Sequence, residues 1–302
     1  MNYVVGIMLL AVVTAVACAL PGVFVVLRRD SMLVDAIGHA VLPGIVVGYA
    51  VTRDLNSPWL IVGAAVAGLV VVLGSEWLAS TRLLTGDSPQ GLVFPALFSA
   101  GVIMVSLDFA DIHLDTHAVL VGDLNLAAFA QWYVGGVSIG PRYLYVMLAV
   151  LAVMAGFLVT FFRVLTMTTF DPAFAASAGV RTRWLNTAFM FLVSVTVTAA
   201  FHAAGAVLVL ALMVVPAATA LQVARRMSTM VLVSLLVAVG GSLVGFWAAY
   251  ALDAATSAGI AFVHGLLFTL VHLSVRGRRR WERFRDASRV ERGPVGLGGS
   301  AL

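Results

Sequence analysis

The amino-acid sequence is divided into apolar segments that are each about as long as a membrane is thick. A helix rises about 1.5 Å per residue, so roughly 20 apolar residues span the ~30 Å hydrocarbon layer of a bilayer. Hydrophobic residues make up 62% of the chain and charged residues 11%, whereas soluble domains average about 45–50% and ~25%. The segments also lack the alternation typical of barrel strands. The sequence therefore predicts an all-α fold, a polytopic transmembrane helical bundle of about nine spans: 4–27, 32–51, 58–80, 89–107, 143–165, 184–201, 204–223, 229–251 and 258–275.

The arginines between these segments predict which side of the membrane each loop faces. If Arg28 and Arg29 lie in the cytoplasm, the other loops on that side and the C-terminal tail hold nearly all the remaining arginines. The loops on the other side hold only Arg53 and Arg142. Because basic residues are enriched in cytoplasmic loops, this distribution predicts an N-terminus outside and a C-terminus inside.

Two stretches do not fit a simple series of spans. Residues 117–142 are moderately apolar but interrupted by polar residues, so we expect a re-entrant or interfacial helix there, or a tenth span. Residues 276–302 follow the transmembrane domain, 1–275, as a basic cytoplasmic tail with a Gly-rich, disordered end. The basic cluster of the tail favours an anchor near anionic lipid headgroups over nucleic-acid binding.

One apolar segment carries a carboxylate and an imidazole four residues apart, Asp35 and His39. On a helix this spacing puts both side chains on one face. Counted from Arg29, they lie about 9 and 15 Å into the hydrocarbon layer. A buried Asp at such depth costs roughly 2.5 to 3.5 kcal/mol, which a divalent cation would offset. Alternatively, Asp35 pairs with an arginine or caps a broken helix, and His39 donates to a backbone carbonyl.

A short helix is predicted over residues 171–179, in a loop on the cytoplasmic side. Asp171 suits the N-cap, Pro172 the first helical position and Gly179 the C-terminal stop. Two interpretations are open: a capped connector between spans, or a docking helix that inserts into a groove on a cytoplasmic partner.

Further potential metal ligands lie on the opposite side of the membrane. The loop with Asp111, His113, Asp115 and His117 is either a secondary site that captures cations or an ordinary solvated loop. His202 is either an interfacial histidine or a ligand at an outer gate. Near the cytoplasmic side, the simplest partner for Glu76 is Arg82.

Several classes of function are excluded by what the sequence lacks. It has no Lys, so it cannot contain the P-loop pattern GxxxxGK[ST], and it has no HExxH motif of a zinc protease. Cys18 is the only cysteine, which excludes an internal disulfide and a Cys-based zinc site. A transporter subunit without catalysis of its own is therefore favoured over a membrane metalloenzyme. A stand-alone secondary metal carrier or channel is the alternative.

Five motifs, in order along roughly residues 20–275, resemble those of the permeases that import manganese, zinc or iron with an ABC ATPase. They are Arg28-Arg29 with Asp35–Gly44, Thr85–Asp87 with Gly91–Val93, Val121–Leu124, Phe170–Gly179, and Gly205–Val209 with Pro216–Ala220. The chain departs from the family pattern at Val34, where the family usually has Gly. It also lacks a Pro-containing turn at residues 253–259.

The resemblance implies a fold and a mechanism. Two permease copies, or this chain and a related second permease, would surround a central pathway in a bacterial inner membrane. ABC ATPase subunits would dock below, and an extracellular or periplasmic metal-binding protein would deliver the ion. Asp35 and His39 would be ligands for the transported Mn, Zn or Fe ion, with no tightly bound cofactor. Asp171, Pro172, Phe174 and Gly179 would shape the helix that couples to the ATPase.

Overall fold

Nine long, apolar helices make up most of the part of the chain that the computed structural model describes, residues 3–53, 59–84, 86–108, 124–134 and 137–290. Each is long and apolar enough to cross a membrane, which confirms the nine predicted segments. The helices are α1 (Tyr3–Arg28), α2 (Ser31–Thr52), α3 (Trp59–Ser80), α4 (Ser88–Asp108), α7 (Arg142–Phe170), α9 (Thr182–Ala204), α10 (Ala206–Val223), α11 (Met227–Ala251) and α12 (Thr256–Val290).

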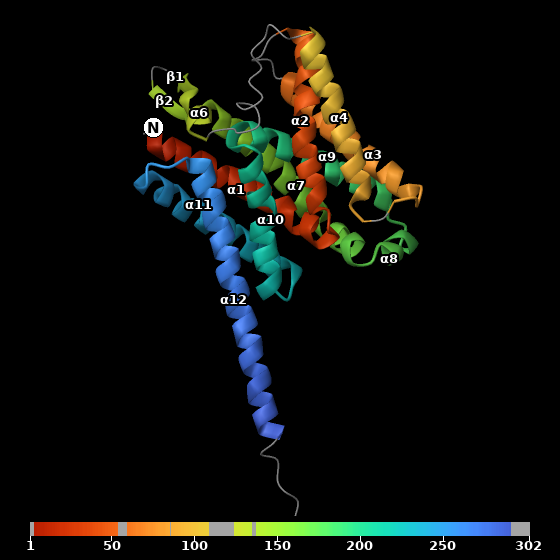
Figure 1. Ribbon diagram of the computed structural model, residues 1–302, viewed down its shortest axis with the longest axis vertical. Helices are drawn as coiled ribbons and strands as arrows, with labels where there is room; N and C mark the ends of the chain where they lie inside the picture. The colour runs from red at the N-terminus through yellow and green to blue at the C-terminus, as the bar shows by residue number, and fades with distance from the viewer. Residues whose placement is uncertain (1–2, 54–58, 85, 109–123, 135–136, 291–302) are drawn as a thin grey trace, which may run out of the picture.

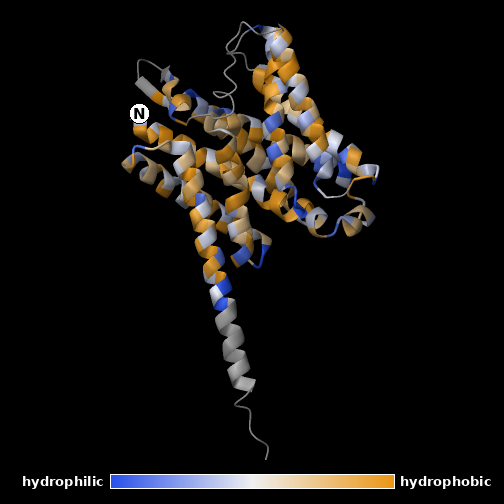
Figure 2. Ribbon diagram, viewed as in Figure 1, coloured by the Kyte–Doolittle hydropathy of each residue, from blue (hydrophilic) through white to orange (hydrophobic). Residues whose placement is uncertain are grey.

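The helices pack in two groups around α1 and α2 (Figure 1). Helix α1 lies in the interior, in contact with α7, α9, α10 and α11. Helix α2 packs most extensively on α3, and also on α4 and α9. Apolar residues run along the helices in both groups, while hydrophilic residues gather in the connections (Figure 2). Helix α12 continues beyond the predicted end at residue 275 and extends away from the bundle (Figure 1).

Glycines allow α2 and α3 to approach at backbone distance. A Cβ atom added at Gly44 would overlap the Cα of Ala64, and one added at Gly63 would overlap the carbonyl oxygen of Gly44. Neither position can hold a side chain unless the two helices separate. Because such close packing fixes α3 relative to α2, the two helices are expected to move as one unit.

The connection between α1 and α2 is short and holds the start of α2 beside the end of α1. Arg29 has φ 65°, a left-handed conformation that is uncommon for a residue other than Gly. The Asp30 N–H donates to the carbonyl of Val25 at 3.0 Å, which closes the turn. We call this end of the bundle, which also carries α8 (Pro172–Ser177), the α8 end.

The irregular stretch near residues 117–142 contains no tenth span in its described part, residues 124–134 and 137–142. A short helix, α6 (Leu124–Phe129), is followed by the antiparallel strands β1 (Gln131–Val134) and β2 (Val137–Pro141). The hydroxyl of Tyr3 donates to the carbonyl of Asn125 at 2.8 Å, so α6 lies across the N-terminal end of α1. The hairpin was not predicted: a strand of four residues is too short for alternation to distinguish it from a helix.

Candidate metal site

Asp35 and His39 lie one turn apart on α2 and face out of the single chain. The Nε2 atom of His39 is 3.8 Å from Oδ1 of Asp35. The side chain of Asp35 is 43% exposed and that of His39 is 39% exposed. The residues between them, Ala36, Ile37 and Gly38, are buried. At 3.8 Å the two side chains do not form a hydrogen bond. The separation is close to the ~3.4 Å between two ligand atoms on one tetrahedral ion.

The imidazole of His39 lies against two aromatic rings of α4. It stacks on Phe94, with ring centroids 5.2 Å apart, and meets the edge of Phe98 at 6.1 Å. These rings limit the plane that the imidazole can adopt, and in that plane Nε2 lies on the side of Asp35. Sequence reasoning missed both phenylalanines, because no periodicity indicates which face of α4 meets α2.

Two residues of α2 near His39, Gly38 and Pro43, change how the helix packs and which backbone hydrogen bonds it forms. A Cβ atom added at Gly38 would overlap the ring of Phe201, so the glycine lets α9 pack directly behind the pair. Pro43 lies inside α2 and has no N–H to donate to the carbonyl of His39, four residues earlier. The carbonyl of His39 therefore lacks the helical hydrogen bond that a residue with an N–H at position 43 would donate.

The other predicted ligands are not brought to this pair within the described residues. The predicted capture site of Asp111, His113, Asp115 and His117 lies outside those residues. His202 is exposed on α9, with its ring centroid 5.1 Å from that of Tyr143. In the described part of the chain, no group of three or more His, Cys, Asp or Glu side chains is placed to hold one ion. Here the chain offers a pair of side-chain ligands, open on one side.

The predicted short helix is present as α8, and its caps are those the sequence indicated. The carboxylate of Asp171 accepts a hydrogen bond from the Phe174 N–H at 2.9 Å, and Pro172 is the first helical residue. Gly179 follows the helix with φ 81°, a conformation that favours Gly. The side chain of Phe174 is 58% exposed. The part of the chain that the structure describes thus leaves more than half of Phe174 uncovered.

Comparisons with known proteins show which family the chain belongs to. The profile of the ABC 3 transport family matches residues 1–275. The zinc transport system membrane protein TroD of Treponema pallidum is 42% identical over 272 residues, which are 88% of this chain and 72% of that protein. The manganese transport system membrane protein MntD of Bacillus subtilis is 33% identical over 273 residues, 90% of this chain and 92% of that protein.

A solved structure has the same fold. PsaBC from Streptococcus pneumoniae, in complex with Fab, superposes with a TM-score of 0.73 at 22% identity, covering 90% of this chain and 91% of the other. The family profile covers nearly all of the transmembrane region, and the relatives align over most of their own length. This chain belongs to the ABC 3 transport family.

Proposed function

We propose that this chain is the membrane-spanning permease subunit of an ATP-driven importer of divalent transition-metal ions, Mn²⁺, Zn²⁺ or Fe²⁺. The observation that carries this proposal is the Asp35–His39 pair, two half-exposed ligand side chains one turn apart on a membrane helix whose other residues are largely buried. A carboxylate oxygen and an imidazole nitrogen suit these three ions. The names of the zinc and manganese relatives support the same class of substrate.

A second permease would complete the site. Two side chains leave a divalent ion under-coordinated, since zinc sites commonly have four ligands. A two-fold axis beside α2 would bring a second Asp35 and His39 to the same ion, because a symmetric interface places the same residues on both sides. A related second permease with an equivalent pair would serve equally.

Energy for import comes from a partner. Without Lys the chain cannot hold nucleotide phosphates as a P-loop does, so ABC ATPase subunits hydrolyse the ATP. Helix α8, with Phe174 exposed, is the surface on which we expect an ATPase to dock, and Asp171, Pro172 and Gly179 fix its shape. An extracellular or periplasmic binding protein delivers the ion from the other side.

The test is uptake of radioactive Mn²⁺, Zn²⁺ and Fe²⁺ into proteoliposomes that contain the transporter with its ATPase, in the presence of its metal-binding protein. We expect uptake of at least one ion that requires ATP and is lost in Asp35→Ala and His39→Ala. The matched controls are Asp253→Asn and His272→Ala, a carboxylate and an imidazole elsewhere in the chain, which should transport normally. Uptake that is equally fast without ATP would favour a stand-alone carrier or channel instead.

A further inference from the structure

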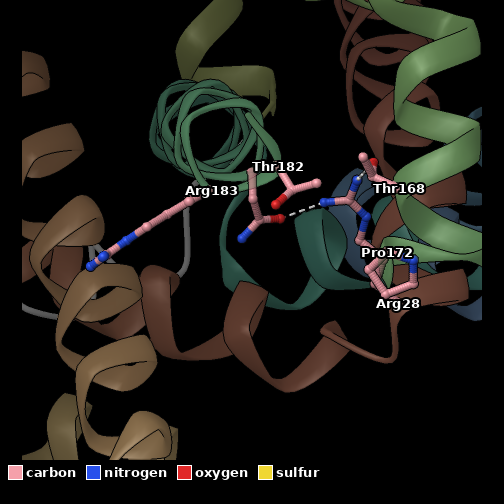
Figure 3. Close-up of a pocket in the computed structure, with 6 residues that line it drawn as sticks. Arg28, Thr168, Pro172, Thr182 and Arg183 are labelled. Carbon is pink, nitrogen blue, oxygen red and sulfur yellow. Dashed lines mark hydrogen bonds between the residues drawn. The ribbon is translucent and has the colours of Figure 1, made fainter. Parts of the chain in front are cut away.

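One guanidinium joins three helices at the α8 end. Arg28, the last residue of α1, donates from Nε to the hydroxyl of Thr169 at 3.0 Å and from a terminal nitrogen to the hydroxyl of Thr168 at 3.4 Å. Its other terminal nitrogen donates to Oδ1 of Asn186 on α9. The guanidinium also lies 5.0 Å from the ring centroid of Phe189. Figure 3 shows the side chain of Arg28 directed toward Thr168 and toward α9.

The threonine hydroxyls are well placed to accept from Arg28. Each donates its own proton to the carbonyl of Leu165, at 3.0 Å from Thr168 and 2.7 Å from Thr169. Their lone pairs therefore remain for the guanidinium. Both hydroxyls thus donate and accept at once, which makes the end of α7 a fixed partner of α1.

The side chain of Asn186 relays the contact to a fourth helix. Its Nδ2 donates to Oε1 of Glu76 on α3 at 2.6 Å, while its Oδ1 accepts from Arg28. The amide is thus oriented with its oxygen toward the cation and its nitrogen toward the carboxylate. Glu76 was expected to pair with Arg82, but the described residues contain no ion pair between them. We call Arg28, Thr168, Thr169, Asn186 and Glu76 the Arg28 cluster.

The Arg28 cluster lies between α8 and the start of α2. Thr169 precedes the N-cap of α8 by two residues, and Pro172 of α8 lines the same pocket of about 230 Å³ as Arg28 and Asn186 (Figure 3). On the other side, Asp30 at the start of α2 interacts electrostatically with Arg28 and Glu76. Asp35 follows Asp30 by five residues, roughly 7.5 Å along the helix.

We infer that Arg28 is a positioning residue that transmits displacement of α8 to α2 and α3, and so to the Asp35–His39 pair. This inference rests on the proposed function, because it assumes that an ATPase moves α8. The Arg28 cluster is the polar contact that reaches from the end of α7 through α1 and α9 to α3. Because α3 packs on α2 at backbone distance, a shift of the cluster is passed to the helix that carries the ligands.

A charge relocation within the Arg28 cluster tests this role. Asn186→Asp places a second carboxylate against Glu76, and this like-charge contact breaks the relay. In the double variant Asn186→Asp/Glu76→Gln, the new carboxylate at position 186 accepts from Arg28, and the new amide at position 76 donates to that carboxylate, so the relay is restored. We expect the single variant to reduce the metal ions transported per ATP hydrolysed by about tenfold, the effect of losing one hydrogen bond to a charged group. The double variant should return to within about twofold of wild type, since only the position of the negative charge has changed.

Two further variants test Arg28 itself and the specificity of the effect. Arg28→Lys retains the charge but cannot reach three partners at once, so it should also lower the ratio, and it can be measured if Asn186→Asp fails to fold. Arg183→Ala is the control, because Arg183 lines the same pocket but points away from Arg28 (Figure 3). Metal binding by the detergent-solubilised variants should equal that of wild type.

The outcomes separate this inference from the proposed function. An unchanged ratio in Asn186→Asp and Arg28→Lys would overturn the inference, as would a proportional fall of uptake and ATP hydrolysis, which indicates a purely structural role. If the double variant does not recover the ratio of metal ions transported to ATP hydrolysed, the inference is also overturned, because the relay from Arg28 through position 186 to position 76 then does not set that ratio. If the wild-type transporter itself shows no ATP-dependent uptake, the proposed function is wrong before any variant is compared.

Discussion

At the scale of single residues, the carboxyl group of Asp30, in the connection between α1 and α2, makes the stability of the fold depend on pH. Burial raises the pKa of Asp30 to about 6; the charge of Arg28 opposes the shift, and Glu76 and Asp87 add to it. The folded protein therefore binds more protons than the unfolded chain between pH 3.8 and about 6, and stability falls as the pH rises through this window. When the pH is raised from 5 to 7.5, we expect the free energy of unfolding of wild type to fall by at most about 1.4 kcal/mol more than that of Asp30→Asn.

Thermal unfolding in detergent at the two pH values measures this difference. Asp253→Asn, a neutralised carboxylate in an exposed turn, is the control and should follow wild type. If Asp30→Asn and wild type change in parallel, the raised pKa of Asp30 is wrong.

The residues around the ligand pair show which contacts a sequence can indicate. The spacing of Asp35 and His39 sufficed to place both on one face of α2, because the period of a helix is fixed. The rings of Phe94 and Phe98 belong to another helix, and their contact with His39 depends on how α4 packs. The partners of Arg28 lie more than a hundred residues away in the chain, so no local pattern could indicate them.

At the scale of helices and strands, apolar length predicted all nine spans, and capping residues predicted α8. These features are local, so the sequence reveals them directly. The hairpin β1–β2 and the continuation of α12 to Val290 were not predicted. A four-residue strand gives too little alternation, and the polar residues after 275 end the apolar signal without ending the helix. The potential ligands in residues 109–123 lie outside the described residues.

The close approach of α2 and α3 predicts a sensitive position at Gly44. A methyl group there would overlap the backbone of Ala64, so Gly44→Ala must separate the helices. We expect a loss of about 1–3 kcal/mol, as for overpacked cores, together with weaker metal binding. Gly156→Ala on α7, where a Cβ meets nothing within 4 Å, should be neutral or slightly stabilising. The measurement is the melting temperature of each variant, which should be lower for Gly44→Ala than for Gly156→Ala. Equal melting temperatures would contradict the packing argument.

Helix α8 gives a prediction about coupling. Removing the exposed ring in Phe174→Ala should leave metal binding intact but reduce ATP-dependent uptake about tenfold or more, as truncation of a central aromatic at an interface does. Uptake and ATP hydrolysis are measured together in proteoliposomes. Trp184→Ala, another exposed aromatic near the same end, is the control. Normal uptake by Phe174→Ala would show that α8 is only a connector.

At the scale of the whole molecule, the open side of the ligand pair indicates an assembly. The described part of one chain brings two ligand side chains together, and a divalent ion needs more. If two copies share one ion, the purified assembly should bind about one ion per two chains. A mixed dimer with one His39→Ala copy should bind much more weakly than wild type. Equal binding by the mixed dimer would contradict a shared site.

The central claim is that Asp35 and His39 bind the transported ion, and metal content tests it most directly. The detergent-purified protein is equilibrated separately with Mn²⁺, Zn²⁺ and Fe²⁺, and its metal is measured by elemental analysis beside folded Asp35→Ala, His39→Ala and the control His272→Ala. We predict stoichiometric metal in wild type and in the control, and its loss in both site variants. Retention of as much metal in the two site variants as in wild type would contradict the account.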